Sequence, residues 1–169
     1  MLPELLSELC KIDGLRWIRT LYTYPERITD ELLGVMAKEK KIVKYLDMPI
    51  QHVNADILKR MNRKGDYKSL SDLVDHIRET VPNITLRTTL ITGFPGETEE
   101  QFDHLMDFVE DIQFDRLGAF TFSPEEDTPA AEMPDQLGEE VKQERLDRLM
   151  TRQQQISLMR NQLRVGTVE

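Results

Sequence analysis

The stretch Thr85–Phe102, which reads TLRTTLITGFPGETEEQF, predicts a strand, a sharp turn and a helix in immediate succession. Residues 86–91 are mostly apolar or β-branched, as expected of a buried strand. Residues 93–96 end this strand, because two glycines and a proline cannot continue a hydrogen-bonded ladder. Thr98 and Gln101 then have the spacing of a capping box, which opens a helix. This pattern is typical of one repeating unit of an α/β protein.

The glycine turn at residues 93–96 has two interpretations. A turn of this kind places backbone amides and a helix N-terminus at the carboxyl end of a strand, where α/β proteins bind ligands. Alternatively, the glycines only make a tight connection. The turn is not a Walker loop, because the lysine and hydroxyl of that motif are missing.

The composition is that of an ordinary protein of about one domain. Of the 169 residues, 39% are hydrophobic and 31% are charged, and the net charge is −9. Such a charge argues against a general nucleic-acid surface. No signal peptide or membrane-spanning run is present in the sequence, so we expect a cytoplasmic protein. A single cysteine, Cys10, excludes an internal disulfide and any site made of three cysteines from this chain.

Hydrophobic periodicity predicts four strands that alternate with helices. The strands are expected at 15–24, 42–50, 86–91 and 117–122, and the helices at 3–12, at 29–39, after Asn54, from Ser69 or Ser71 to Val81, and after Thr98. Units of this length fit parallel strands joined by helical crossovers. The predicted fold is therefore an α/β fold with a parallel sheet. We expect a first strand of this sheet to lie upstream of Met1, because the chain opens on a helix.

The pattern changes after residue 122. Three prolines interrupt an acidic loop, and a long charged helix follows from about Glu139 to Leu163. The division into domains is accordingly expected at 1–128 and 129–169. The second part would brace the first or lead to a further domain. The apolar side of the long helix is predicted to consist of Val141, Leu146, Leu149, Met150, Ile156 and Met159.

Polar residues fall at strand ends, where such folds place their chemistry. Strand alternation sends Arg87, Thr89 and Ile91 to one face of the third strand. An arginine there must meet a carboxylate, because an unpaired buried charge costs several kcal/mol. The partner is either Asp47 or Glu97 in a structural pair, or a bound carboxylate. His52 likewise is either a hydrogen-bonded structural residue or part of a site.

Four blocks of sequence resemble the methylthiotransferase branch of the radical S-adenosylmethionine (SAM) enzymes. They are WIRTLYTYPERIT, YLDMPIQHVNADILKRMNRKG, LRTTLITGFPGETEEQF and LGAFTFSPEEDTPAA. Within that branch, LYTYP and the acidic SPEEDTPAA are similar to the RimO type, which modifies a ribosomal protein, rather than to the tRNA-modifying MiaB type. The usual RimO-like pattern has glycine before the threonine of the last block, where Asp127 stands here. Thr89 likewise replaces a glycine of the general radical pattern.

The resemblance implies a partial (β/α)₆ barrel of the TIM type that lacks its first strands and carries a C-terminal helical extension. It also implies S-adenosylmethionine and 4Fe-4S clusters as cofactors, an electron donor, and methylthiolation at the β-carbon of an aspartate in small-subunit ribosomal protein twelve. The cluster cysteines are expected upstream of Met1, and a TRAM domain after the long helix. We therefore expect the 169-residue chain alone to bind no cluster and to be inactive.

Two alternatives stay open at this point: a MiaB-like tRNA enzyme, the only one with a nucleic-acid partner, and a non-catalytic α/β binding module. No membrane partner is expected. The resemblance assigns cofactor binding to Gln51, His52, Arg87, Thr89, Gly93, Phe94, Gly96 and Phe122. In this assignment Gln51 lies near the ribose of S-adenosylmethionine and Arg87 near its carboxylate. The two glycines are expected to let the cofactor approach the backbone.

Overall fold

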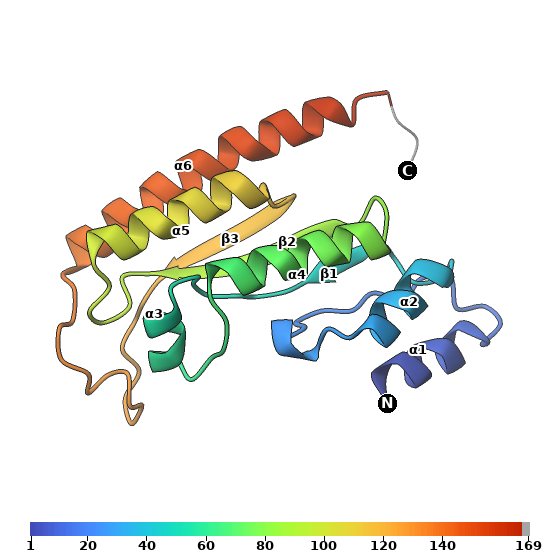
Figure 1. The fold of residues 1–169 in the computed structure, drawn as a ribbon, viewed down its shortest axis with the longest axis horizontal. Coiled ribbons are helices and arrows are strands. Elements are labelled where there is room, and N and C mark those ends of the chain that lie inside the picture. Colours follow the sequence, from blue (N-terminus) through green and yellow to red (C-terminus); the bar gives the residue numbers. More distant parts are fainter. Residues whose placement is uncertain (167–169) are drawn as a thin grey trace.

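The computed structural model describes residues 1–166 and has a three-stranded parallel sheet at its centre (Figure 1). The strands are β1 (Tyr45–Asp47), β2 (Thr85–Thr92) and β3 (Arg116–Thr121), in the spatial order β1-β2-β3. Each strand is followed by at least one helix, as parallel connections require. The predicted α/β class with a parallel sheet is confirmed.

Six α-helices and one short 3₁₀ turn accompany the sheet in the described residues. They are α1 (Leu2–Cys10), η1 (Pro25–Arg27), α2 (Asp30–Lys38), α3 (Ala55–Arg60), α4 (Tyr67–Thr80), α5 (Glu99–Ile112) and α6 (Glu139–Leu163). Thr29, Asn54 and Thr98 cap α2, α3 and α5 as predicted. The predicted start of α4 at Ser69 or Ser71 is wrong, because Asp66 caps this helix and Ser69 completes its capping box.

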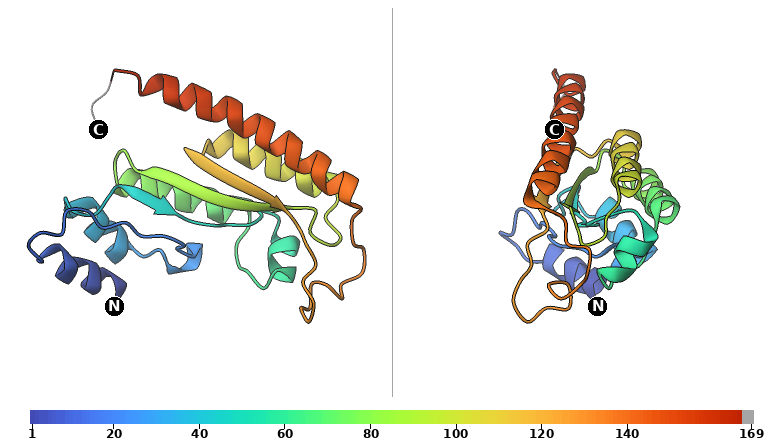
Figure 2. Two further views of the ribbon diagram at one scale, coloured as in Figure 1. Left: turned by 180° about the vertical axis from the view of Figure 1, so that it is seen from behind. Right: turned by 90° about the vertical axis from the view of Figure 1, so that its left-hand side faces the viewer.

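The sheet has one covered face and one open face, and the side chains of β2 alternate between them. Buried and half-exposed residues of β2 alternate along its whole length. Helices α4 and α5 cover the side to which Leu86 and Leu90 point, and these leucines belong to one hydrophobic core with Val74 and Phe102 (Figure 2). Arg87, Thr89 and Ile91 share the other face, as the alternation predicted.

The predicted strand at 15–24 is wrong. Only one bridge, between Ile18 and Ile42, links this segment to its neighbour in ladder fashion. Tyr22 then enters the left-handed region with φ 60°, which interrupts an extended chain. Trp17 is 80% exposed and Leu21 and Tyr22 are also exposed, so of the apolar residues that suggested a strand Ile18 is the one that packs against the core. Four predicted strands thus become three, and the 42–50 strand is shortened to β1.

Helix α6 has the predicted bounds, and its buried face agrees only in part with the predicted apolar side, because Leu149 and Ile156 are buried and Met150 packs against the core. Its buried residues are Lys142, Arg145, Leu149, Gln153 and Ile156, whereas Val141 and Met159 are exposed. The buried positions recur every three or four residues, so they form one helical stripe. This stripe packs against α5 and β3. No helix formed by residues 1–166 has the length and apolar character needed to cross a membrane.

Leu149 joins α6 to the same hydrophobic core as the sheet. The division at 128/129 stays a prediction, and residues 167–169 of the second part lie outside the described residues.

We expect Leu149→Ala to lower the free energy of unfolding by about 2–5 kcal/mol, since it empties a fully buried site. The matched change Leu158→Ala, at a side chain 62% exposed on the same helix, should cost less than about 0.5 kcal/mol. Urea denaturation followed by circular dichroism gives both values. Equal effects would show that α6 does not belong to the core.

Candidate functional site at the carboxyl end of the sheet

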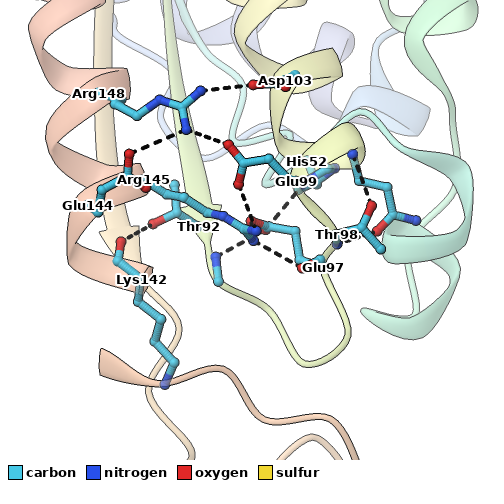
Figure 3. Close-up of polar contacts among 12 residues, drawn as sticks. His52, Thr92, Glu97, Thr98, Glu99, Asp103, Lys142, Glu144, Arg145 and Arg148 are labelled. Carbon is cyan, nitrogen blue, oxygen red and sulfur yellow. Dashed lines mark hydrogen bonds and ion pairs between the residues drawn. The ribbon is translucent and has the colours of Figure 1, made fainter. Parts of the chain in front are cut away.

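Three segments meet beyond the carboxyl ends of the strands. They are the loop between β1 and α3, the glycine turn between β2 and α5, and the first turns of α6 (Figure 3). Six of the eight residues to which the sequence assigned cofactor binding lie in these segments or next to them: Gln51, His52, Gly93, Phe94, Gly96 and Phe122. Thr89 and Arg87 lie further back on β2.

Gln51 occupies a strained and incompletely satisfied position. Its φ of 70° lies in the left-handed region, which is uncommon for a residue other than glycine. The backbone is fixed there by two bonds of 2.9 Å to β2: its N–H donates to the Thr89 carbonyl and its own carbonyl accepts from the Ile91 N–H. The side chain is nearly buried, and its Oε1 has no hydrogen-bond partner among the described residues. A buried acceptor without a donor is costly, so this atom fits a ligand hydroxyl.

His52 is completely buried and faces the glycine turn. Its Nδ1 accepts a hydrogen bond of 2.9 Å from the Asn54 N–H, so Nε2 carries the proton of the neutral ring. Nε2 lies 3.5 Å from Oε2 of Glu97, which is too long for a strong hydrogen bond. These contacts support the structural interpretation of His52, as a residue that links the loop after β1 to the turn after β2.

Glu97 is the centre of the polar contacts in Figure 3. Its side chain is fully buried. One oxygen accepts from the Gly93 N–H at 3.0 Å, and the other accepts from Arg145 Nη1 of α6 at 2.7 Å. The same Arg145 nitrogen also donates to the Glu97 carbonyl at 3.0 Å. A buried carboxylate with both oxygens occupied and a guanidinium opposite is fully compensated, so Glu97 has a structural role here.

A second arginine extends this network to the surface. Arg148 of α6 bonds Glu99 and Asp103 in the first turns of α5. Hydrogen bonds from Arg148, and secondarily from Arg145, hold the pKa of the Glu99 carboxyl below its usual range. Both acids lie near the N-terminus of α5, where the helix dipole also favours negative charge. The negative charges at the start of α5 are thus balanced by arginines of α6.

Most amides of the glycine turn are hydrogen-bonded within the chain, which favours the interpretation of the turn as a tight connection. The Gly93 N–H donates to Glu97 and the Gly96 N–H donates to the Asp135 carbonyl at 2.8 Å. The N–H groups of Glu97 and Thr98 are also bonded within the chain, to the Phe94 carbonyl and to Gln101. The amides therefore stabilise the turn itself.

The two glycines are required for packing within the chain. Both have φ 73°, and a Cβ at Gly93 would lie 2.4 Å from Cγ of Lys142. A Cβ at Gly96 would lie 2.4 Å from Nη1 of Arg60. The room that the sequence interpretation reserved for a cofactor is thus taken by two cationic side chains of the protein. Gly93 and Gly96 are turn-making residues first, and direct contact with a cofactor stays a prediction.

Two aromatic rings lie beside this turn. Phe94 and Phe122 pack edge to face with their centroids 5.1 Å apart. Lys142 Nζ lies 5.6 Å from the centroid of Phe122, and the guanidinium of Arg60 lies 5.8 Å from that of Phe94. Phe94 is buried, whereas Phe122 is partly exposed, so Phe122 is the ring that an adenine could reach.

Arg87 takes a carboxylate of its own chain as its partner. Its Nη1 lies 2.7 Å from Oδ1 of Asp47 on β1, which is the first of the structural pairs that the sequence allowed. In the sheet register Arg87 pairs with Asp47 and Gln51 with Leu90, so the two predicted cofactor residues are three positions apart along β2, or about 10 Å. The structure does not bring Arg87 and Gln51 together.

One departure from the expected motif has a backbone explanation. Asp127, which stands where the RimO-like pattern has glycine, adopts φ 62°. This is the left-handed conformation that glycine favours, and aspartate tolerates it better than most residues. Asp127 therefore adopts a backbone conformation that glycine would also allow.

Comparison with known proteins identifies the superfamily. A model of the Radical SAM superfamily matches residues 1–109. The chain belongs to the radical SAM superfamily. Among solved structures it is similar to coproporphyrinogen III oxidase (HemN) from Escherichia coli, a radical SAM enzyme, with a TM-score of 0.71 and 23% identity over 92% of this chain and 36% of that one. It also resembles the radical S-adenosylmethionine methyltransferase TsrM from Kitasatospora setae, with a TM-score of 0.57, 18% identity, and coverage of 70% and 24%. The predicted partial radical SAM barrel is confirmed.

Curated relatives are much more similar in sequence. The chain is 55% identical to a ribosomal protein uS12 methylthiotransferase RimO from Geobacter sulfurreducens, over 99% of this chain and 38% of the relative. It is 53% identical to the protein of the same name from Clostridioides difficile, over 98% of this chain and 37% of the relative. The chain thus spans less than two fifths of the length of these relatives.

Sequence reasoning missed the contribution of α6 to this site. Lys142 and Arg145 were not considered, because a helix is normally oriented by its apolar side. The signal that could have found them is the three-four spacing of Lys142, Arg145 and Leu149. Within residues 1–166, no group of three or more histidine, cysteine or acidic residues is placed to hold a metal ion.

The pair Glu97–Arg145 should behave as a buried ion pair. We expect Glu97→Gln and Arg145→Met each to lower the free energy of unfolding by about 3–5 kcal/mol, because each leaves an uncompensated buried charge. The double variant should lose clearly less than the sum, because it removes both charges together. The exposed pair Glu110–Arg152 is the control, with single effects of about 0.2–1 kcal/mol. Additive losses in a urea-denaturation cycle would contradict the role assigned to Glu97.

Proposed function

We propose that this chain forms part of the catalytic barrel of a methylthiotransferase that acts on ribosomal protein uS12. The observation that carries the proposal is 55% identity over 99% of the chain to a relative of that name. Following the resemblance, the modified atom is the β-carbon of an aspartate. An electron donor and a cytoplasmic location belong to the same proposal, since the substrate is a ribosomal protein.

One atom of the described residues, Oε1 of Gln51, is suited to accept a hydrogen bond from S-adenosylmethionine. The buried Oε1 of Gln51 lacks a donor, and a ribose hydroxyl would supply one. The left-handed backbone of Gln51, fixed by its two bonds to β2, orients this side chain in advance. Phe122 would offer a ring face to the adenine. The Thr89 carbonyl accepts a hydrogen bond from the Gln51 N–H and would thereby help to fix the position of Gln51.

The chemistry of the reaction would come from S-adenosylmethionine bound beside a reduced 4Fe-4S cluster, which together supply an organic radical. Cys10 is the single cysteine of the chain, and three cysteine ligands are needed. The cluster ligands are therefore part of the proposal for the complete protein. The role of this chain is to position the cofactor and to keep the glycine turn rigid through Glu97 and Arg145.

The activity can be tested on the complete protein after anaerobic reconstitution. We expect mass spectrometry to find a methylthio group on a uS12 peptide that contains the target aspartate, and none on the same peptide with alanine in its place. A parallel reaction with tRNA should remain unmodified. Modification of tRNA alone would replace this function with the MiaB-like one, and modification of neither substrate by a protein with intact clusters would overturn the proposal.

Gln51→Ala should weaken binding of S-adenosylmethionine about three- to tenfold, which corresponds to the loss of one neutral hydrogen bond of about 0.5–1.5 kcal/mol. Gln113→Ala is a matched control, because Gln113 also has a left-handed backbone, with φ 52°, but lies at the end of α5. Calorimetric titration of the complete protein measures the affinities, and thermal melts measure stability. Both variants should lose similar stability, and only Gln51→Ala should lose affinity. Unchanged affinity in Gln51→Ala would remove Gln51 from the site.

A further inference from the structure

A polar pocket lies at the amino end of the sheet, opposite the site around Gln51. It has a volume of about 610 Å³ and runs across the amino ends of all three strands. Residues from the segment before α2 and from α6 also line it. Its lining residues are Arg19, Tyr45, Thr85, Arg87, Arg116, Leu117, Gly118, Ser157 and Arg164.

Four of the residues that line this pocket, which we call the amino-end pocket, are arginines. Arg87 is paired with Asp47, and Arg164 is paired with Asp115, at 2.7 and 2.9 Å. Asp115 is shared, because Arg160 of α6 also contacts it at 2.9 Å. Within residues 1–166, the carboxylates that form salt bridges with Arg87, Arg160 and Arg164 are thus Asp47 and Asp115.

The other two arginines of the pocket have only neutral contacts among the described residues. The guanidinium of Arg19 lies over the ring of Tyr45, 3.7 Å from its centroid. Arg116 donates to the Asp115 carbonyl at 2.8 Å and to Asn161 at 3.4 Å. Neither forms a salt bridge with a described carboxylate. Arg19 and Arg116 therefore leave the described part of the pocket with more guanidinium groups than paired carboxylates, in a chain whose net charge is −9.

Guanidinium groups gathered around one pocket repel one another, although solvent weakens this repulsion at Arg19 and Arg116, which are exposed. Desolvation and the nearby charge of Arg160 lower the pKa of Arg78 on α4, and Asp115 and Asp75 oppose this shift. The carbonyls of Ile112 and Gln113 hold Arg78, so it adds to the positive field without entering the pocket. A bound anion would relieve this repulsion.

We propose that the amino-end pocket binds a phosphoryl group, either as a free ion or as part of a phosphomonoester. Guanidinium groups match the oxygens of phosphate in bidentate fashion, and a dianion balances the excess charge better than a single carboxylate. The hydroxyls of Thr85 and Ser157 line the same pocket and add neutral donors. Gly118 also lines the pocket, beside Arg87.

The amino-end pocket is separate from the site around Gln51. Thr85 begins β2 and Thr92 ends it, and a strand of this length spans about 20 Å. None of the residues Gln51, His52, Glu97 or Phe122 lines the pocket. A ligand bound here would therefore contact the protein at a distance from the glycine turn. The inference does not depend on the reaction that the carboxyl end performs.

Titration calorimetry on the complete protein at near-physiological salt tests this inference. The probes are inorganic phosphate and ribose 5-phosphate, with acetate as a monoanionic comparison. We expect saturable binding of at least one phosphate probe and much weaker binding of acetate. Tighter binding of ribose 5-phosphate would identify the ligand as a phosphomonoester, and equal binding would identify the free ion.

Arg19→Gln and Arg116→Gln should each weaken phosphate binding about tenfold or more, because each removes a guanidinium that has no carboxylate partner among the described residues. Arg152→Gln is the matched control, since Arg152 lies on α6 outside the pocket and pairs with Glu110. Thermal melts without phosphate verify that the variants fold. No saturable binding to the wild-type protein, or equal binding in Arg19→Gln, Arg116→Gln and wild type, would overturn the proposal.

Discussion

The buried carboxylate of Glu97 is the interaction on which the carboxyl end of the sheet depends. It receives the Gly93 amide from the turn after β2 and the Arg145 guanidinium from α6, and it faces His52 from the loop after β1. A single side chain thus connects three segments that are far apart in the sequence. A residue in this position can fix the shape of the glycine turn only if its charge is compensated, and Arg145 supplies that compensation.

This constraint explains why α6 turns a mixed face toward the sheet. Near its start the helix must deliver Arg145 to Glu97 and lay Lys142 over Gly93, and further along it must place Leu149 and Ile156 in the core. These demands fall on one stripe of the helix. The apolar residues Val141, Leu158 and Met159 of the helix are left exposed on other sides. Polar contacts at one end and hydrophobic contacts at the other therefore determine the rotation of α6 together.

The features that the sequence predicted correctly are those set by local chemistry. Thr98 caps α5 because a hydroxyl and a glutamine three residues later satisfy its first amides, whatever surrounds them. The alternation along β2 follows from the pleat of a strand. The errors arose where a distant segment decides the outcome. Residues 15–24 have strand-like composition but pair with their neighbour at a single bridge. Composition alone does not determine which segments form hydrogen-bonded ladders.

The two ends of the sheet differ in how completely their polar groups are satisfied. At the carboxyl end the amides of Gly93, Gly96 and Glu97 are bonded within the chain. The buried side-chain atoms without a hydrogen-bond partner there, among the described residues, are Gln51 Oε1, His52 Nε2 and Arg145 Nε, of which Gln51 Oε1 is an acceptor. At the amino end the unbalanced groups are cations, and they line an open pocket. A lone acceptor in a rigid setting selects a ligand by a single hydroxyl, whereas an excess of guanidinium groups selects by charge. The two proposed sites would therefore differ in selectivity. Residues of α6 and its C-cap reach both ends of the sheet, with Lys142 beside the glycine turn and Arg164 in the amino-end pocket.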